Sequence, residues 1–99
     1  MATVKVVRYT TKPEAADENA RLVKAVFAEL AETRPDGLRY ATVRLDDGVS
    51  FVHIAEVDAE HNPLSSSPAF AEFQAGLGDR VTEGPDPRDA EIVGSYRLL

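Results

Sequence analysis

Two histidines are the side chains in this sequence best suited to exchange a proton near neutral pH. His53 lies within a β-rich run and shares a predicted strand face with Tyr40 and Thr42 of the preceding run. A neutral imidazole in that position could accept a proton from a phenolic substrate. The alternative is a buried histidine that is hydrogen-bonded to a neighbour. His61 lies in a polar stretch beside Asn62, where exposure to solvent is the simpler interpretation.

The spacing of possible metal ligands argues against a metal site. The two histidines form no His-x-x-x-His pair, and a strand directs His53 and Glu56 to opposite faces. The chain has no cysteine, which excludes thiolate zinc ligands, disulfides and a cysteine nucleophile. The run Ser65-Ser66-Ser67 lacks the flanking glycines of a hydrolase nucleophile, and the chain has neither a Gly-x-Gly-x-x-Gly motif nor a P-loop. We therefore expect no metal and no bound cofactor.

Aromatic and amide side chains at helical spacing could form the wall of a small-molecule pocket. Phe70, Phe73 and Gln74 lie on a predicted short helix and could line a space between that helix and the sheet. The alternative is that both phenylalanines belong to the core. Arg8 lies in the middle of a strand and could anchor a carboxylate or enolate oxygen, or pair with an acidic side chain across a dimer. The hydroxyls that could reach such a pocket are those of Tyr9, Tyr40 and Tyr96.

Length and charge narrow the possible partners. The chain has 99 residues, which suits one domain over 1–99. Its 17 acidic and 11 basic residues give a net charge of −6, which disfavours nucleic acid and anionic membranes as partners. No apolar run approaches the length needed to cross a bilayer, and the first residues do not read as a secretory signal. We expect a cytoplasmic protein.

Hydrophobic periodicity and turn residues predict the elements that position these side chains. Thr11 and Glu14 resemble a capping box at the start of the first helix, and Ser67 with Pro68 resembles the start of the second. We expect Val81 to Asp89 to be an extended loop. The expected elements are a strand over Val4–Thr10, a helix to about Arg34, strands over Leu38–Leu45 and Val49–Val57, a helix from Ser67, and a strand over Ala90–Leu98.

The order β-α-β-β-α-β predicts an α+β, ferredoxin-like fold. The expected architecture is an antiparallel four-stranded sheet of order 4-1-3-2 with both helices on one face. The turn at Asp47-Gly48 predicts a hairpin in which Thr42 opposes His53 and Arg39 opposes Glu56.

Strand alternation divides the hairpin residues between two faces. One face would pack under the helices and carry Ala41, Val43, Leu45, Val52 and Ile54. The other face would stay uncovered and carry Leu38, Tyr40, Thr42, Phe51, His53, Ala55 and Val57. An uncovered apolar face is unusual on a monomer, so we expect a two-fold homodimer that buries it.

The sequence resembles the antibiotic-biosynthesis-monooxygenase-like family of the dimeric α+β barrel superfamily. The resemblance covers essentially the whole chain. The motifs that carry it are V-K-V-V-R-Y-T followed by K-P-E, the helix that ends in P-D-G, L-R-Y-A-T-V-R-L with the D-D-G turn into F-V-H-I-A-E-V, and S-P-A-F-A-E-F-Q.

This resemblance implies a small, cofactor-independent monooxygenase that acts on an aromatic or enolic molecule. In that interpretation His53 is the base, and Tyr40 or Arg8 stabilises the oxyanion. The alternative is a non-catalytic ligand-binding or structural homodimer of the same fold. The family's heme-degrading chemistry is not expected, because the chain has no tryptophan and carries Gln74 where a histidine would be sought. The residues expected to contact a substrate are Phe70, Phe73, Gln74, Asn62 and Tyr96.

Overall fold

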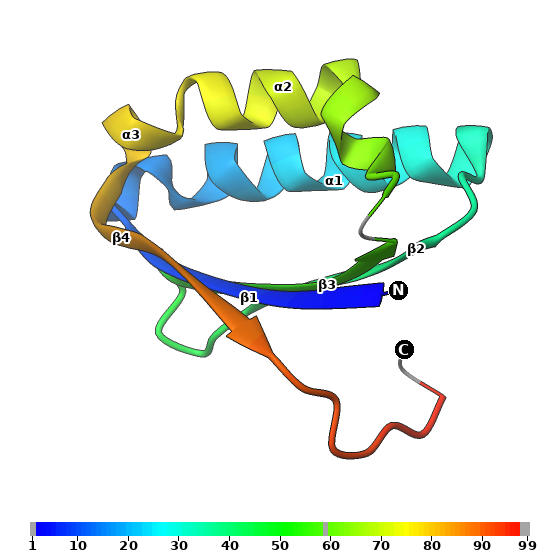
Figure 1. The fold of residues 1–99 in the computed structure, drawn as a ribbon. Helices are drawn as coiled ribbons and strands as arrows, with labels where there is room; N and C mark the ends of the chain where they lie inside the picture. Colours follow the sequence, from blue (N-terminus) through cyan, green and yellow to red (C-terminus); the bar gives the residue numbers. More distant parts are fainter. Residues whose placement is uncertain (1, 59, 98–99) are drawn as a thin grey trace.

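The computed structural model describes residues 2–58 and 60–97. One antiparallel sheet carries a layer of helices on one face, and the opposite face has no helix over it (Figure 1). The elements in chain order are β1 (Ala2–Thr11), the 3-10 turn η1 (Pro13–Ala15), α1 (Ala16–Thr33), β2 (Leu38–Arg44), β3 (Ser50–Asp58), the 3-10 turn η2 (Pro63–Ser66), α2 (Pro68–Ala75), α3 (Leu77–Arg80) and β4 (Val81–Ala90).

The strand order is β2-β3-β1-β4, which is the predicted order read from the other edge. β1 and β3 are the two central strands, as the predicted strand order requires. The hairpin register is also as predicted, because Thr42 pairs with His53 and Arg39 pairs with Glu56. The turn itself differs from the prediction, because Gly48 N donates to Leu45 O at 3.0 Å, which places Asp46 and Asp47 at its centre rather than Asp47 and Gly48.

The two helices begin differently from each other. Ser67 caps α2 as predicted, with its Oγ accepting from Phe70 N at 3.0 Å. Thr11 does not cap the first helix, because it is the last residue of β1 and its hydroxyl donates to Val49 O at 3.2 Å. The chain instead enters α1 through the turn η1.

The predicted last strand is wrong. β4 occupies Val81–Ala90, most of which was expected to be a loop, and residues 91–97 form no strand; Leu98 lies outside the described residues. Gly84, Pro85 and Pro87 suggested a loop, but β4 is an edge strand, and proline is tolerated there because one side of the strand needs no N–H donors. Gly84 has φ 81°, and a Cβ on it would lie 2.8 Å from the backbone O of Arg8, so this position requires glycine.

The predicted assignment of the sheet faces is also wrong. Tyr40, Phe51 and His53 lie beneath the helices, whereas Val43, at 47% exposure, lies on the open face with Ala41, Val52 and Ile54. The alternation itself was predicted correctly, but both sets of residues are largely apolar. The set with the large aromatic rings is the one under the helices, because it buries more apolar area there.

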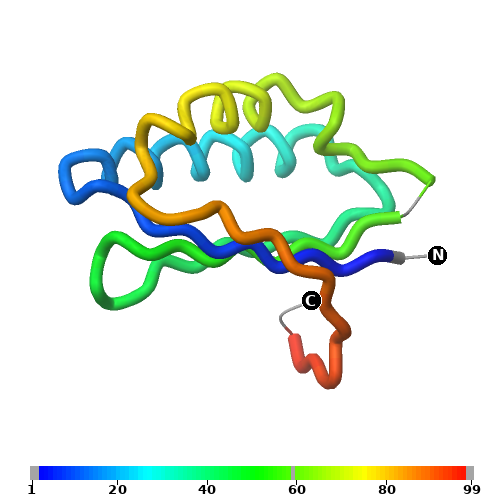
Figure 2. Tube along the Cα trace, turned by 60° about the vertical axis from the view of Figure 1, so that its left-hand side comes forward, coloured from blue at the N-terminus to red at the C-terminus, as the bar shows by residue number. Residues whose placement is uncertain are grey.

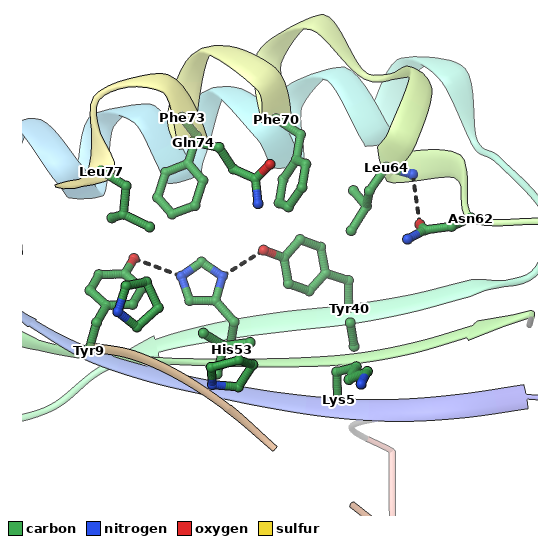
Figure 3. A pocket seen from close by; sticks show the side chains of 14 residues that line it. Lys5, Tyr9, Tyr40, His53, Asn62, Leu64, Phe70, Phe73, Gln74 and Leu77 are labelled. Carbon is green, nitrogen blue, oxygen red and sulfur yellow. Dashed lines mark hydrogen bonds between the residues drawn. The ribbon is translucent and has the colours of Figure 1, made fainter. Parts of the chain in front are cut away.

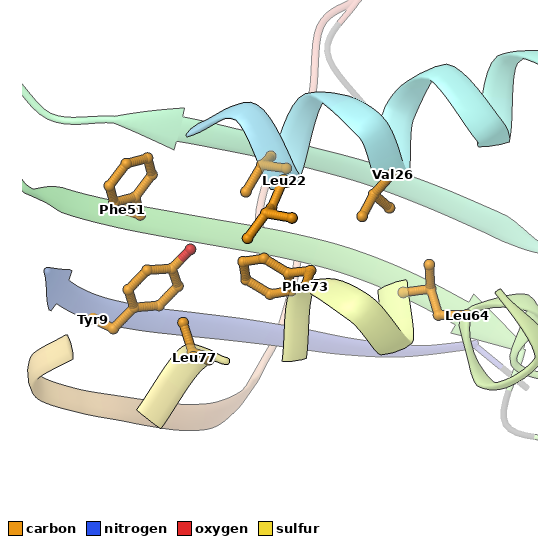
Figure 4. Close-up of a cluster of buried hydrophobic side chains, with 8 residues drawn as sticks. Tyr9, Leu22, Val26, Phe51, Leu64, Phe73 and Leu77 are labelled. Carbon is orange, nitrogen blue, oxygen red and sulfur yellow. The ribbon is translucent and has the colours of Figure 1, made fainter. Parts of the chain in front are cut away.

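The core lies between the sheet and the helices (Figure 4). α1 and α2 pack against each other above the sheet, and both views place the segment that follows β4 on the opposite side (Figures 1 and 2). In the described part of the chain, no helix is long and apolar enough to cross a membrane. The buried apolar cluster comprises Tyr9, Leu22, Val23, Val26, Phe51, Leu64, Phe73 and Leu77.

Candidate active site

A cavity of about 300 Å³ lies between the sheet and the helices α2 and α3 (Figure 3). β1, β2 and β3 form its floor, while α2, the turn η2 and the edge strand β4 form its other walls. Such a volume suits a small ring compound. The lining side chains are Lys5, Val7, Tyr9, Tyr40, His53, Ala55, Asn62, Leu64, Phe70, Phe73, Gln74, Leu77, Pro85 and Pro87.

The polar part of the floor is a histidine held between two tyrosines. The Tyr9 hydroxyl lies 2.7 Å from His53 Nε2, and the Tyr40 hydroxyl lies 2.6 Å from His53 Nδ1 (Figure 3). The Thr42 hydroxyl is a second neighbour of Nδ1, at 3.1 Å. Both ring nitrogens are therefore engaged.

Two further polar side chains lie behind this trio. Asn19 Nδ2 donates to the Tyr9 hydroxyl at 2.8 Å, and Arg80 Nε donates to Asn19 Oδ1 at 3.0 Å. Arg80 Nη2 also donates to Phe73 O at 2.6 Å, and its guanidinium lies 5.4 Å from the Phe73 ring centroid. Asn19 is fully buried and Arg80 is only 8% exposed. The trio is thus continuous with a buried chain of hydrogen bonds that starts at a cation.

Burial keeps the three titratable groups of the trio neutral. Desolvation lowers the pKa of His53 from 6.5 to about 4. It raises the pKa of both Tyr9 and Tyr40 from 10.0 to about 12, against the opposing effects of Asn19 and Arg80 at Tyr9 and of Thr42 at Tyr40. At neutral pH the trio therefore offers hydrogen-bond donors and acceptors without a net charge of its own. The cation among the side chains that line the cavity, Lys5, is paired with Asp89.

Aromatic rings surround the trio. Phe73 lies 5.4 Å from the His53 ring and 6.0 Å from Phe70, centroid to centroid. Tyr40 also contacts Phe27 of α1, at 4.8 Å between centroids. These contacts hold the rings in one arrangement and give the cavity flat apolar walls, which suit a planar ligand.

Solved structures with the same architecture place the chain among known proteins. The sequence matches no protein-family model and none of the curated proteins. A protein from Bacteroides thetaiotaomicron, provisionally assigned as an antibiotic biosynthesis monooxygenase, superposes with a TM-score of 0.80 at 18% identity, covering 99% of this chain and 96% of that one. Rv0793 from Mycobacterium tuberculosis gives 0.73 at 19% identity, over 96% and 98% of the two chains. SnoaB from Streptomyces nogalater, a cofactor-independent oxygenase, gives 0.69 at 21% identity, over 97% of each chain.

The chain has the antibiotic-biosynthesis-monooxygenase-like fold. This is the fold that the sequence resemblance predicted, and the likeness extends over nearly the whole length of each neighbour. In this fold the cavity described above lies between the sheet and the second helix, where the sequence placed the possible pocket.

The monooxygenase-like fold brings together most of the residues that the sequence singled out. Seven of them line the cavity, namely Tyr9, Tyr40, His53, Asn62, Phe70, Phe73 and Gln74. The Oδ1 of Asn62 also accepts from Leu64 N at 3.0 Å, so this residue caps η2 at the edge of the cavity (Figure 3).

Two of the predicted site residues lie elsewhere. Arg8 is exposed on the open face, because Val7 and Tyr9 on either side of it point into the cavity. Tyr96 is 81% exposed in the segment after β4, where the predicted last strand does not exist. Neither residue is among those that line the cavity.

Sequence reasoning missed Asn19 and Arg80. The signal for Asn19 was present, because it shares the buried face of α1 with Leu22, Val23 and Val26. A polar residue inside such an apolar stripe must have a partner. Among the described residues no three histidine, aspartate or glutamate side chains gather as a metal site would require.

Proposed function

We propose that this protein is a small oxygenase that acts without a bound cofactor on an aromatic or enolic small molecule. The observation that carries the proposal is the Tyr9–His53–Tyr40 trio on the floor of a cavity with flat apolar walls. The likeness in fold to SnoaB, a cofactor-independent oxygenase, supports the same reaction class. The apolar walls would hold a ring system, and the polar floor would face its oxygen.

The proposed reaction needs only the substrate and molecular oxygen. A CH₂ group activated by a conjugated carbonyl loses one proton to solvent as the substrate binds as its enolate, and the carbanion binds O₂ to form a peroxide anion. That anion takes up a proton, and the hydroperoxide then loses water to leave a ketone. The CH₂ carbon gives up four electrons and O₂ accepts four, so one oxygen atom enters the product and the other leaves as water.

The geometry favours a direct role for Tyr40 and an indirect one for His53. Both nitrogens of His53 are hydrogen-bonded to tyrosines, and burial holds its pKa at about 4, so it is a poor base for direct contact with substrate. Tyr40 is therefore the group proposed to contact the enolate oxygen, with His53 orienting it. Arg8, which the sequence offered as the alternative oxyanion partner, is on the other face of the sheet.

Replacing Tyr40 by phenylalanine is expected to slow oxygen uptake with anthrone at least tenfold. Anthrone carries a CH₂ group between two rings and would give anthraquinone and water. A hydrogen bond to a charged oxygen is worth about 1.5–3 kcal/mol, which sets the size of the effect. The measurements are O₂ consumption and the absorbance of the quinone. Tyr96→Phe makes the same chemical change at an exposed hydroxyl and should leave the rate unchanged.

The same experiment separates the two functions that the sequence left open. If anthrone binds to the wild-type protein but no O₂ is consumed, the non-catalytic ligand-binding alternative is the better description. If Tyr40→Phe consumes O₂ at the wild-type rate, Tyr40 has no part in the chemistry.

We further propose that two copies of the chain associate through the open face of the sheet. That face carries the partly exposed Val43 with Val52 and Ile54, and the segment on the same side of the sheet exposes Val93 by 93% and Tyr96 by 81%. A second copy would remove these apolar groups from water. An uncovered apolar face thus predicts a dimer here as well, but on the face that carries Val43 rather than on the face that carries Tyr40 and Phe51. A cytoplasmic location stays a prediction.

A charge placed on the open face is expected to prevent association. Wild-type protein at micromolar concentration should sediment as a dimer, whereas Val43→Asp should sediment as a monomer because a carboxylate would be buried unpaired in the interface. Tyr40→Phe, which changes only the other face, should remain dimeric. A wild-type protein that sediments as a monomer throughout the micromolar range contradicts the proposal.

A further inference from the structure

The chain of hydrogen bonds from Arg80 to Tyr40 has a defined direction, which begins at its cationic end. A guanidinium has only donors. Arg80 Nε lies 3.0 Å from one end of the Asn19 amide, so that end must be the carbonyl oxygen. The amide NH₂ group of Asn19 then faces the Tyr9 hydroxyl, 2.8 Å away, and donates to it.

The next hydrogen bond is donated by the Tyr9 hydroxyl to the His53 imidazole. Because the Tyr9 oxygen accepts from Asn19, its own proton is available for its other neighbour, His53 Nε2 at 2.7 Å. If Nε2 carried a proton instead, the Tyr9 oxygen would accept twice, and its buried hydroxyl proton would have no acceptor among the described hydrogen bonds. Nε2 is therefore the bare nitrogen of a neutral His53, and Nδ1 carries the proton.

The last donor in the series is the Tyr40 hydroxyl, which lines the cavity. The Nδ1 proton points to the Tyr40 hydroxyl at 2.6 Å, with the Thr42 hydroxyl further away at 3.1 Å. When the Tyr40 oxygen accepts this proton, the proton of its own hydroxyl is left to point elsewhere. The Thr42 hydroxyl lies beside the Tyr40 hydroxyl and can accept that proton when the cavity is empty. Because Tyr40 lines the cavity, a bound ligand competes with Thr42 for the same proton.

We propose that Arg80 and Asn19 are positioning residues that fix His53 as the Nδ1–H tautomer, make Tyr40 a hydrogen-bond donor toward the cavity, and so select ligands bound as an enolate or phenolate. The ligand class rests on the proposed function, whereas the direction of the chain does not. Arg80 takes part in none of the ion pairs found among the described residues, so its buried charge polarises this chain in the sense that favours an anion at the far end. The pKa shifts of the trio agree, since its members are neutral at neutral pH.

Asn19→Asp is the variant that should reverse the direction of the hydrogen bonds between Asn19 and Tyr40. A carboxylate only accepts, so it would accept from Arg80 and also from the Tyr9 hydroxyl. The Tyr9 oxygen would then accept from His53 Nε2–H, and Nδ1 would accept from Tyr40. The substitution is nearly isosteric and gives Arg80 a counter-charge. It should therefore preserve the fold while removing the donor from the cavity.

The tautomer of His53 can be measured directly by two-bond ¹H–¹⁵N correlation spectra at neutral pH, without any ligand. We expect the Nδ1–H pattern in the wild-type protein and the Nε2–H pattern in Asn19→Asp. Arg80→Lys keeps a donor-only cation and should keep the wild-type pattern. Asp17→Asn, the reverse exchange at an exposed position of α1, should also keep it. A wild-type Nε2–H pattern, or one pattern shared by wild type and Asn19→Asp, overturns the proposal.

Tyr9→Phe covers the case in which Asn19→Asp does not fold. This variant removes the proton donated to Nε2, so the Nε2–H form should appear alongside the Nδ1–H form. If Nδ1–H alone persists in Tyr9→Phe, the hydrogen bonds from Arg80 through Tyr9 do not set the tautomer of His53, and the proposal fails.

The ligand class is tested with 4-nitrophenol, whose phenolate absorbs visible light and whose phenol does not. The wild-type protein should bind the phenolate at least tenfold more tightly than the phenol, which lowers the apparent pKa of the bound probe by one unit or more. Asn19→Asp should abolish that preference although it leaves Lys5, the cation that lines the cavity and pairs with Asp89, in place. Preferential binding of the neutral phenol to wild type overturns the ligand class. If the spectra are as expected but the protein does not oxidise anthrone, the proposed oxygenase function is overturned. The inferred direction of the hydrogen bonds is then unaffected.

Discussion

Asn19→Leu is expected to lower the free energy of unfolding by about 3 kcal/mol, as urea denaturation would show. The leucine fills a similar volume, but it leaves Arg80 Nε without its acceptor at a position that is only 8% exposed. The Tyr9 hydroxyl also loses its donor. Removing one partner of a buried charged group is costly because the remaining group cannot return to water. Lys24→Leu, an exposed change on the same helix, should shift stability by less than about 0.5 kcal/mol.

The double variant Asn19→Leu with Arg80→Met tests the cause of that loss. Arg80→Met alone removes the buried charge but leaves Asn19 Oδ1 and Phe73 O without their donors. In the double variant the unpaired cation and the unpaired amide disappear together. Its loss of stability should therefore be smaller than the sum of the two single losses, by about 1–3 kcal/mol. Additive losses would mean that Asn19 and Arg80 stabilise the protein independently.

The fold could be predicted because its determinants are local. The period-two and helical patterns place α1, α2 and every strand except β4, and the turn between Leu45 and Ser50 fixes the register of β2 against β3. The same register brings Tyr40, Thr42 and His53 onto one face, so the nucleus of the site was within reach of sequence reasoning.

The parts of the site that the sequence did not reveal depend on contacts between distant segments. These parts are Asn19, Arg80 and the contact of Tyr9 with His53. Asn19 and Arg80 are 61 residues apart, and only the packing of α1 against α3 brings them together. Tyr9 meets His53 across the β1–β3 ladder, and this contact requires the strand order as well as the alternation. Alternation likewise shows which residues share a face but not which face the helices cover, and so the open face was assigned wrongly.

Acidification is expected to remove about 3 kcal/mol of stability through His53 alone between pH 6.5 and pH 4. Burial lowers the pKa of this histidine to about 4 in the folded protein, against an ordinary value of 6.5. As the pH falls through this window, the unfolded chain takes up a proton that the folded protein still excludes. The free energy of unfolding therefore falls by up to about 1.4 kcal/mol per pH unit, and below pH 4 both states are protonated and the contribution ends.

Two glutamine variants isolate this contribution, because each removes one imidazole and the chain has only two. His53→Gln should lose the extra decline in stability between pH 6.5 and pH 4 in urea denaturation, although it starts from a lower stability at pH 7. His61 is exposed, so His61→Gln should decline in parallel with wild type. Parallel curves for wild type and His53→Gln would show that the imidazole between the tyrosines can be protonated in place. The neutral hydrogen-bond chain that orients Tyr40 would then not exist at mildly acidic pH.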